Sequence, residues 1–563
     1  MNAASTAAPS TASADLGRGS SGYDHAFRAV LWLCIALLLL QILTFGYGRD
    51  QGIYAVVART MLDGGMPYRD AWDFKPPGIF LIYALSRALL GGGQWAIRLL
   101  EVLGLAGMVL GMVHLARRWW GQPSAGLLAG ALAVLVHTQL DFWHTAQPES
   151  FGGMLIIAGL CVGTSRAASR RPRLMHGLSG VLFGCAGLLK PPLAGAGAVF
   201  ALWVMAESPP APDEVGRDRS LVQQARGLVR RGAEPVLSVL CGGALPFAAC
   251  FVWFWARGAF GPMWDALFVF TPHYTAIGYE GSSLPGLLYY SVEEWLVTYS
   301  ALLLVGNVLL LLGGPVLWRV RGVGLLVGIV AIQLLGVAMQ AKYFPYHYGA
   351  VWPPTAMLAA RGWWWLWERA TRRGWLAVLG FACLLGVVGR ARSATKDVSE
   401  SFWTRFAMRI DLFRHSERDL ARVDGLASVA DVNAGENRAV ANLLRDRVPH
   451  GQPVYIWGFE PVIYDLGDLA CASPYIYNVP QRVSWAAERS RAALMGDLEA
   501  HPPAAIVVVH NDVFPMVTGD NADSAALLAD FAPLRSLIEQ HYQHAARIGD
   551  LDVYVRQFEQ AAR

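Results

Sequence analysis

The chain has 563 residues, of which 54% are hydrophobic and only 16% are charged. Soluble domains usually contain about 25% charged residues, so this composition is typical of a membrane protein. The formal net charge of +4 is too small to indicate a protein that binds nucleic acid. The length accommodates one large helical membrane domain and one polar domain of ordinary size.

Residues 1–27 are rich in Ala, Ser, Thr and Gly and lack hydrophobic periodicity, which predicts a disordered cytosolic tail. Residues 28–389 are expected to form a transmembrane domain with about eleven helices, within a range of eleven to thirteen. The apolar runs lie at Ala29–Gly46, Trp95–Ala116, Ala125–Val136, Gly152–Gly163, Gly177–Leu189, Leu193–Met205, Pro235–Trp255, Tyr299–Leu317, Gly322–Met339, Gly349–Ala360 and Trp375–Val388.

Basic residues are concentrated in alternate connections between these runs, including Arg117–Arg118 and the four arginines of 166–173. Under the positive-inside rule this pattern predicts a cytosolic N-terminus. Asp50, the connections 137–149 and 257–295, and everything after Gly389 then lie on the outer face. We expect the membrane to be a bacterial inner (plasma) membrane.

Asp50 is the most informative residue, because it ends the first apolar run. A carboxylate at that depth is unfavourable in hydrocarbon and is tolerated at the water interface or in a cavity. The stretch that follows, at about 51–90, has helical spacing of apolar residues without being apolar enough to span a bilayer. It predicts amphipathic helices on the outer membrane surface.

Residues 390–563 differ in kind, because strand-like and helix-like stretches alternate there. The strand-like runs are Val454–Trp457, Ala505–Val509 and Val553–Val555, and the helix-like ones are Glu436–Arg447 and Trp485–Glu499. This alternation predicts an extracytoplasmic α/β domain. Its role, either acceptor positioning or structural support, is left open.

Several short motifs occur in a fixed order along the chain. They are Asp50–Tyr54, Gly65–Asp70, Asp73–Pro77, Thr145–Phe151, Gly187–Pro192, Lys342–Tyr348 and Ile456–Phe459. Together they resemble the GT-C glycosyltransferases, in particular the protein O-mannosyltransferase-like and aminoarabinose transferase-like group known as glycosyltransferase family 39. The resemblance implies a multi-pass GT-C membrane fold with an outer C-terminal domain.

It also implies an inverting transfer of a hexose or pentose from a polyprenyl-phosphate donor to a hydroxyl of an envelope glycan, glycolipid or protein. Asp50 is then the catalytic base. The expected donor phosphate ligands are Lys75, Lys190, Tyr346 and His347, and the expected substrate contacts are Tyr54, Glu149 and His273.

Structural roles compete with each assignment. Asp50 is also suited to cap a surface helix. Lys75 and Lys190 are also placed to anchor the chain at lipid head groups. Glu149 is a suitable residue for a solvated helix end, with Asp141 a weaker rival in the same loop, while Arg98 and Glu101 are expected to pair structurally.

Two positions depart from the resemblance. Many relatives have Glu where this chain has Gln51, and aminoarabinose transferases usually have Arg where it has Ile53. A neutral amide weakens any metal site there, so a divalent cation stays open and no cofactor is firmly indicated. The competing function is a lipid or sugar transporter or flippase, whose key polar groups usually lie near the bilayer midplane; a non-catalytic membrane scaffold leaves Asp50 and Lys75 unexplained.

Overall fold

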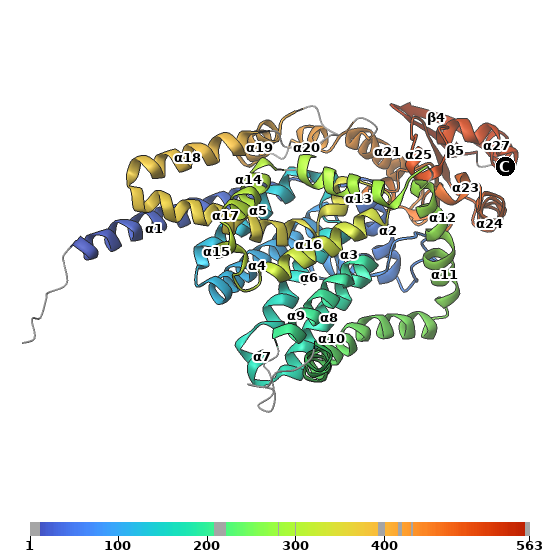
Figure 1. Cartoon of the computed structure of the whole chain (residues 1–563). Coiled ribbons are helices and arrows are strands. Elements are labelled where there is room, and N and C mark those ends of the chain that lie inside the picture. The colour runs from blue at the N-terminus through green and yellow to red at the C-terminus, as the bar shows by residue number, and fades with distance from the viewer. Residues whose placement is uncertain are drawn as a thin grey trace, which may run out of the picture.

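The structure is a computed structural model that describes residues 12–207, 221–279, 281–298, 300–391, 400–414, 419–429 and 432–557. Helices form the chain as far as Arg390, and a small mixed sheet with its own helices follows (Figure 1). The expected multi-pass helical fold with a C-terminal α/β region is therefore confirmed. Part of the expected N-terminal tail, residues 1–11, lies outside the described residues, and the first helix begins at Ala12.

Each of the eleven expected apolar runs coincides with a helix. These helices are α1 (Ala12–Ile42), α4 (Gln94–Trp120), α5 (Pro123–Gln139), α6 (Pro148–Gly163), α8 (Pro172–Leu189), α9 (Gly195–Glu207), α10 (Leu221–Ala256), α14 (Ala301–Leu312), α16 (Val323–Ala338), α17 (Trp352–Arg373) and α18 (Trp375–Arg390). Among the described residues, three helices are long and apolar enough to span a bilayer unaided, or four if one pair bent by 103° counts as a span. The number of crossings stays a prediction.

Shorter helices connect and cover the long ones. They are α2 (Arg49–Leu62), α3 (Gly78–Leu90), α7 (Arg166–Arg170), α11 (Phe260–Trp264), α12 (Thr271–Ala276), α13 (Leu284–Glu293), α15 (Pro315–Trp318), α19 (Phe402–Asp411) and α20 (Leu420–Leu426). Helices α2 and α3 correspond to the expected surface helices. Helix α2, however, is covered by the C-terminal region, since a Cβ at Gly52 would lie 2.8 Å from the backbone nitrogen of Val462.

Small residues bring α8 and α10 into close contact. A Cβ at Gly180 would lie 2.1 Å from the carbonyl oxygen of Val239, and one at Gly184 would lie 2.3 Å from that of Gly243. Membrane helices commonly pack through such small residues, because lipid tails provide no hydrophobic drive for association. The contact holds α10 beside the end of α8, and these two helices form one wall of the cavity described below.

The C-terminal region contains a five-stranded sheet. Its strands are β1 (Pro453–Trp457), β2 (Ala470–Cys471), β3 (Ala505–Val509), β4 (Tyr542–Ile548) and β5 (Leu551–Arg556), in the order β2-β1-β3-β5-β4. Strand β1 is parallel to β2 and β3, whereas β5 is antiparallel to β3 and β4. The surrounding helices are α21 (Ala434–Arg447), α22 (Val462–Gly467), α23 (Val479–Arg482), α24 (Ala487–Ala500), α25 (Pro515–Thr518), α26 (Ser524–Ala529) and α27 (Ala532–His541).

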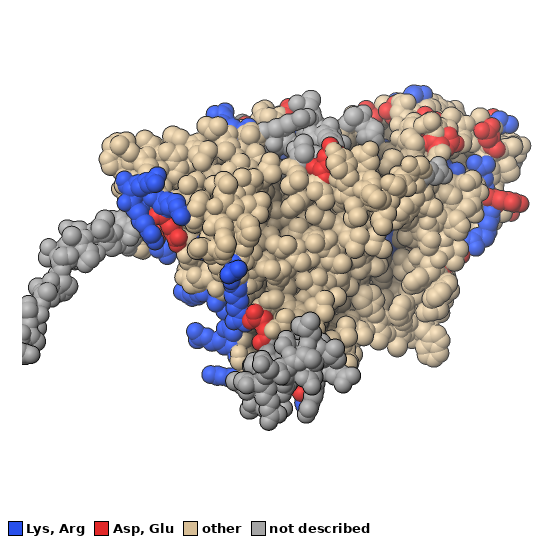
Figure 2. Space-filling model, in the orientation of Figure 1, with Lys and Arg blue, Asp and Glu red and all other residues tan. Residues whose placement is uncertain are grey.

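Charged side chains are unevenly distributed over the surface. Figure 2 shows basic residues gathered at the end of the molecule where α15 and α17 lie, and charges of both signs over the C-terminal region. A broad face with few charges lies between them. This distribution fits the orientation expected from the sequence, which stays a prediction.

A buried ionic cluster joins the membrane helices to the segment that leads into the C-terminal region. Asp141, at the end of α5, has ion pairs of 2.5 Å with both Arg405 and Arg409 of α19. Both guanidinium groups also donate to the carbonyl oxygen of Leu426. Asp141 therefore has a docking role and does not compete with Glu149 for substrate.

We predict that Asp141→Asn lowers the free energy of unfolding by about 3–5 kcal/mol, because two buried guanidinium groups lose the carboxylate that they share. Thermal unfolding in detergent measures the effect. The control is Glu234→Gln, which removes the exposed pair with Arg173 and should cost less than about 1 kcal/mol. Equal melting temperatures for the two variants would contradict the docking role.

Candidate functional site

The first turn of α2 carries Asp50 and is fixed by the neighbouring Gln51. The Gln51 side-chain oxygen accepts a hydrogen bond from the backbone of Gly48, at 2.9 Å. Its amide nitrogen donates to three backbone carbonyl oxygens, including those of Trp143 at 2.9 Å and Thr145 at 2.8 Å. A neutral amide can donate and accept at once, whereas a carboxylate at this position could only accept. Gln51 therefore ties the start of α2 to the connection between α5 and α6.

A buried ion pair also fixes the connection between α5 and α6. Arg98 and Glu101 are fully buried and lie 3.0 Å apart, so their expected pairing is confirmed. Arg98 also donates to the carbonyl oxygen of Gly46, at 2.6 Å, and Glu101 accepts from the backbone of Ala146, at 2.5 Å. Because one end of this pair holds the chain before α2 and the other holds the connection before α6, it fixes their relative position.

Asp50 forms an ion pair with Lys75, and the ammonium nitrogen lies 3.0 Å from one carboxylate oxygen. The Gln147 amide lies 3.3 Å from the other oxygen and accepts from the Tyr54 hydroxyl at 2.9 Å. Burial lowers the pKa of Lys75, but the carboxylates of Asp50 and Asp73 raise it by more, so the pKa lies above its ordinary value. The two carboxylates therefore favour the charged form of Lys75.

A second ion pair, between Lys190 and Glu149, lies where α8 ends and α6 begins. The Lys190 ammonium is also 5.7 Å from the ring centre of Tyr346. The other oxygen of Glu149 is buried and has no hydrogen-bond partner among the described residues. Helix α3 reaches this end of α8 because it starts at Gly78, where a Cβ would lie 2.7 Å from the carbonyl of Leu188.

A third lysine, Lys342, lies in the connection between α16 and α17. Its ammonium donates to the carbonyl oxygen of Met516 in α25 and lies 4.6 Å from the ring centre of Tyr274. Its own carbonyl oxygen contacts the ring of His347. Burial lowers the pKa of Lys342 to about 8, and burial together with Lys190 holds the pKa of His347 well below its usual range.

These groups surround one cavity of about 680 Å³. Its polar wall contains the residues expected from the sequence, which are Asp50, Lys75, Glu149, Lys190, Tyr346 and His347. Helices α8 and α10 and the following segment supply an apolar wall of Leu188, Phe247, Phe251, Leu267 and Phe268. The C-terminal region closes another side with Phe459, Phe514 and Val517. The cavity volume is typical of small-molecule sites.

Two of the expected substrate contacts are not on the cavity wall. Tyr54 is fully buried and reaches the site through Gln147 and through Lys75, whose ammonium is 5.4 Å from the centre of its ring. His273 is exposed, its Nδ1 donates to the carbonyl oxygen of Val269, and its ring stacks on Trp485. Its neighbour Tyr274 lines the cavity instead, since successive residues of a helix point about 100° apart.

The distribution of lysine along the chain is a further sequence signal for this site. The chain has 46 Lys and Arg residues, of which only four are lysine, leaving 42 arginines. Three of these lysines, Lys75, Lys190 and Lys342, line the same cavity, and the fourth, Lys396, lies outside the described residues. Lysine carries a compact charge, whereas arginine presents a planar fork. A count by residue type would have drawn attention to Lys342.

A metal site stays a prediction. Across the parts of the chain that the structure describes, no three His, Cys, Asp or Glu side chains come together in a way that suits a metal ion. The neutral Gln51 next to Asp50 is committed to four backbone groups.

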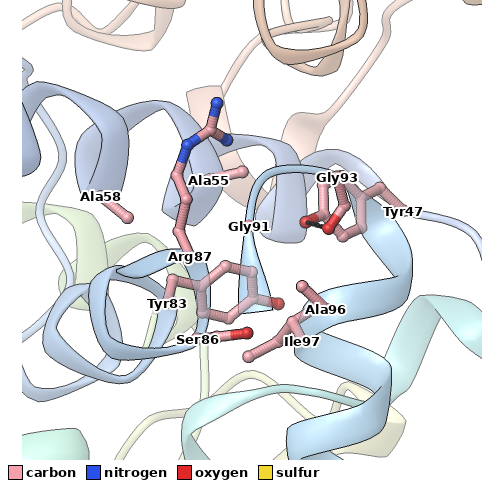
Figure 3. A pocket seen from close by; sticks show the side chains of 10 residues that line it. All are labelled: Tyr47, Ala55, Ala58, Tyr83, Ser86, Arg87, Gly91, Gly93, Ala96 and Ile97. Carbon is pink, nitrogen blue, oxygen red and sulfur yellow. Dashed lines mark hydrogen bonds between the residues drawn. The ribbon is translucent and has the colours of Figure 1, made fainter. Parts of the chain in front are cut away.

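A second, much smaller hollow lies between α2, α3 and α4 (Figure 3). It has a volume of about 10 Å³ and is lined by side chains such as Tyr47, Tyr83 and Ile97. Arg87 at its edge pairs with Asp465 of the C-terminal region, at 2.7 Å. This volume is about that of one water probe, so the hollow is too small to hold a substrate.

We predict that Gln51→Glu destabilises the protein by about 3–5 kcal/mol, because the carboxylate oxygen that replaces the amide nitrogen would then face three carbonyl oxygens without a donor. Thermal unfolding in detergent measures the change. The matched control is Gln452→Glu, the same substitution at an exposed position, which should be nearly neutral. If both variants melt at the wild-type temperature, Gln51 does not hold α2 in the way described.

Comparison with known proteins adds the family context. The model of the dolichyl-phosphate-mannose-protein mannosyltransferase family matches residues 74–210. ArnT from Cupriavidus metallidurans, solved in the apo state, is similar over 95% of this chain and 98% of its own, with a TM-score of 0.53 and 15% identity. The oligosaccharyltransferase AglB from Archaeoglobus fulgidus, solved with an inhibitory peptide and a dolichol-phosphate, matches 95% of this chain and 75% of its own, with a TM-score of 0.42 and 14% identity.

No curated protein sequence matches the chain. The family match spans the segment that contains Lys75, Glu149 and Lys190, and the similarity to ArnT extends over nearly the whole architecture. These two findings confirm the resemblance noted in the sequence: the chain is an integral membrane protein with the fold of the GT-C glycosyltransferase superfamily.

Proposed function

We propose that the protein is an inverting glycosyltransferase that moves a sugar from a polyprenyl-phosphate donor to a hydroxyl acceptor at the outer membrane face. The observation that carries this proposal is the Asp50–Lys75 ion pair, at 3.0 Å, on the wall of a cavity of about 680 Å³. A base and a fixed cation in contact suit a reaction in which a hydroxyl loses a proton and a phosphate leaves.

In the proposed reaction, the acceptor oxygen attacks the anomeric carbon and Asp50 takes the hydroxyl proton. The bond between that carbon and the phosphate oxygen breaks, and its electron pair stays on the phosphate. One displacement without a covalent intermediate inverts the anomeric centre. Lys75 and Gln147 each contact one Asp50 oxygen, which orients the carboxylate as a general base requires.

The leaving phosphate would be stabilised by the cations of the polar wall. Lys75 and Lys190 line the same cavity as Tyr346 and His347. When phosphate approaches Lys75, its charge draws the ammonium away from Asp50 and frees that oxygen for the acceptor proton. Fixed cations in a site that excludes water stabilise developing negative charge strongly.

The remaining walls suit the other parts of the substrates. The apolar wall with Phe247, Phe251 and Phe268 is chemically suited to an isoprenoid chain. The unpartnered oxygen of Glu149 is available to accept a hydrogen bond from a hydroxyl of the sugar or acceptor. An envelope glycan, a glycolipid and a protein hydroxyl all fit this acceptor chemistry. The arginine-rich connections support an orientation with the cavity on the outer face of the membrane, which we propose is a bacterial inner membrane.

We predict that purified protein in detergent transfers sugar from a polyprenyl-phosphate donor, and that Asp50→Asn lowers kcat by about 10²–10⁴-fold, because the variant keeps the shape but loses the base. Radiolabelled sugar transfer measures the rate, with and without EDTA to test the divalent cation. The control, Asp63→Asn, changes an exposed residue at the other end of α2. Transport requires a sealed bilayer, so absent turnover in detergent would favour a transporter, and wild-type turnover of Asp50→Asn would remove Asp50 from the mechanism.

We predict that Lys75→Ala lowers kcat/KM for the donor at least tenfold, because the phosphate loses a charged hydrogen bond. Steady-state kinetics with varied donor concentration measure the effect. Lys75→Arg keeps the charge and should retain more activity than Lys75→Ala. Donor kinetics unchanged in Lys75→Ala would contradict the phosphate role.

A further inference from the structure

The cations on the cavity wall differ in how their charge is balanced. Arg49 pairs with Glu460 at 2.8 Å, Lys75 pairs with Asp50 at 3.0 Å, and Lys190 pairs with Glu149. Within the described ranges, Lys342 has no carboxylate within ion-pair distance, and its ammonium donates only to the Met516 carbonyl. Lys342 is also 1% exposed.

A buried charge without a counter-ion is expensive, so its retention calls for a compensating interaction. The Met516 carbonyl is a neutral partner and the Tyr274 ring offers its face at 4.6 Å. Both hold the ammonium in place, and neither neutralises it. An ammonium has three N–H donors, of which the carbonyl uses one, so two remain for a ligand.

The choice of lysine at position 342 also indicates a site for an anionic ligand. In a chain with 42 arginines and four lysines, a lysine at this position presents a point charge to an anion, which arginine does not do. Lys342 and Lys75 also approach the same cavity-lining segment. Lys342 contacts the Tyr274 ring, and the Phe74 ring beside Lys75 is 4.6 Å from Tyr274.

We propose that Lys342, the uncompensated cation of the cavity wall, binds a phosphate oxygen of the lipid-linked ligand. This inference rests on the proposed function only for the identity of the ligand, since it concerns phosphate binding and requires no sugar transfer. Lys75 and Lys190 neutralise the two carboxylates of the polar wall, and Lys342 supplies the net positive charge that attracts an anion.

The test measures binding to the full chain in detergent by titration calorimetry, with farnesyl phosphate, farnesol and inorganic phosphate as separate probes. Lys342→Gln, which can still donate to the Met516 carbonyl, should bind farnesyl phosphate about tenfold more weakly and farnesol as the wild type does. Lys342→Met gives the same expectation if the Gln variant does not fold. Arg257→Gln removes a charge from an exposed residue outside the cavity and should change neither affinity.

Wild-type affinity of Lys342→Gln for farnesyl phosphate would overturn the proposal, and so would an equal loss for farnesol, which indicates a structural role. Inorganic phosphate that binds as tightly as farnesyl phosphate would assign the residue to a free anion and overturn the lipid-linked ligand. The result is separable from the proposed function. A Lys342-dependent affinity in a protein that transfers no sugar would refute only the transfer, and transfer with unaltered Lys342→Gln binding would refute only this inference.

Discussion

The ion pair of Asp50 and Lys75 is the interaction on which the rest of the site depends. Either charge would be costly alone in a cavity with apolar walls, and the two groups offset each other at 3.0 Å. The pair can form only if the first turn of α2 and the segment before α3 are both fixed. Gln51, with its bonds to four backbone groups, and the buried Arg98–Glu101 pair provide that constraint.

The C-terminal region is part of the site rather than an appendage. The Tyr477 hydroxyl donates to Asp73 at 2.6 Å, Glu460 pairs with Arg49 beside Asp50, and Met516 accepts from Lys342. Asp73 lies two residues before Lys75, Arg49 directly precedes Asp50, and Lys342 itself lines the cavity. Movement of this region relative to the membrane helices would therefore disturb the cavity at three points.

The features that the sequence predicts well are those that depend on local patterns of residues. Apolar runs mark the long helices, short strand-like runs mark β1, β3 and β5, and three-residue spacing marks Arg98 with Glu101. The motifs also locate the groups around the cavity, because they lie at the ends of helices or strands or in the connections between them. The covering of α2 and the two arginine partners of Asp141 depend on contacts between residues hundreds of positions apart, which periodicity does not encode. The rotation of α12 about its axis decides whether His273 or Tyr274 faces the cavity. The sequence does not fix that rotation to within one residue, and in the structure Tyr274 faces the cavity.

The scarcity of lysine has a practical consequence. Apart from Lys396 and the terminal amine, reagents that modify primary amines have only three targets in this chain, and all three face one chamber. Reductive methylation with carbon-13 formaldehyde would thus install a handful of NMR-visible groups on the cavity wall of a large membrane protein. Their chemical shifts would report directly whether a ligand occupies the cavity, without the signal overlap that many surface lysines cause in most proteins.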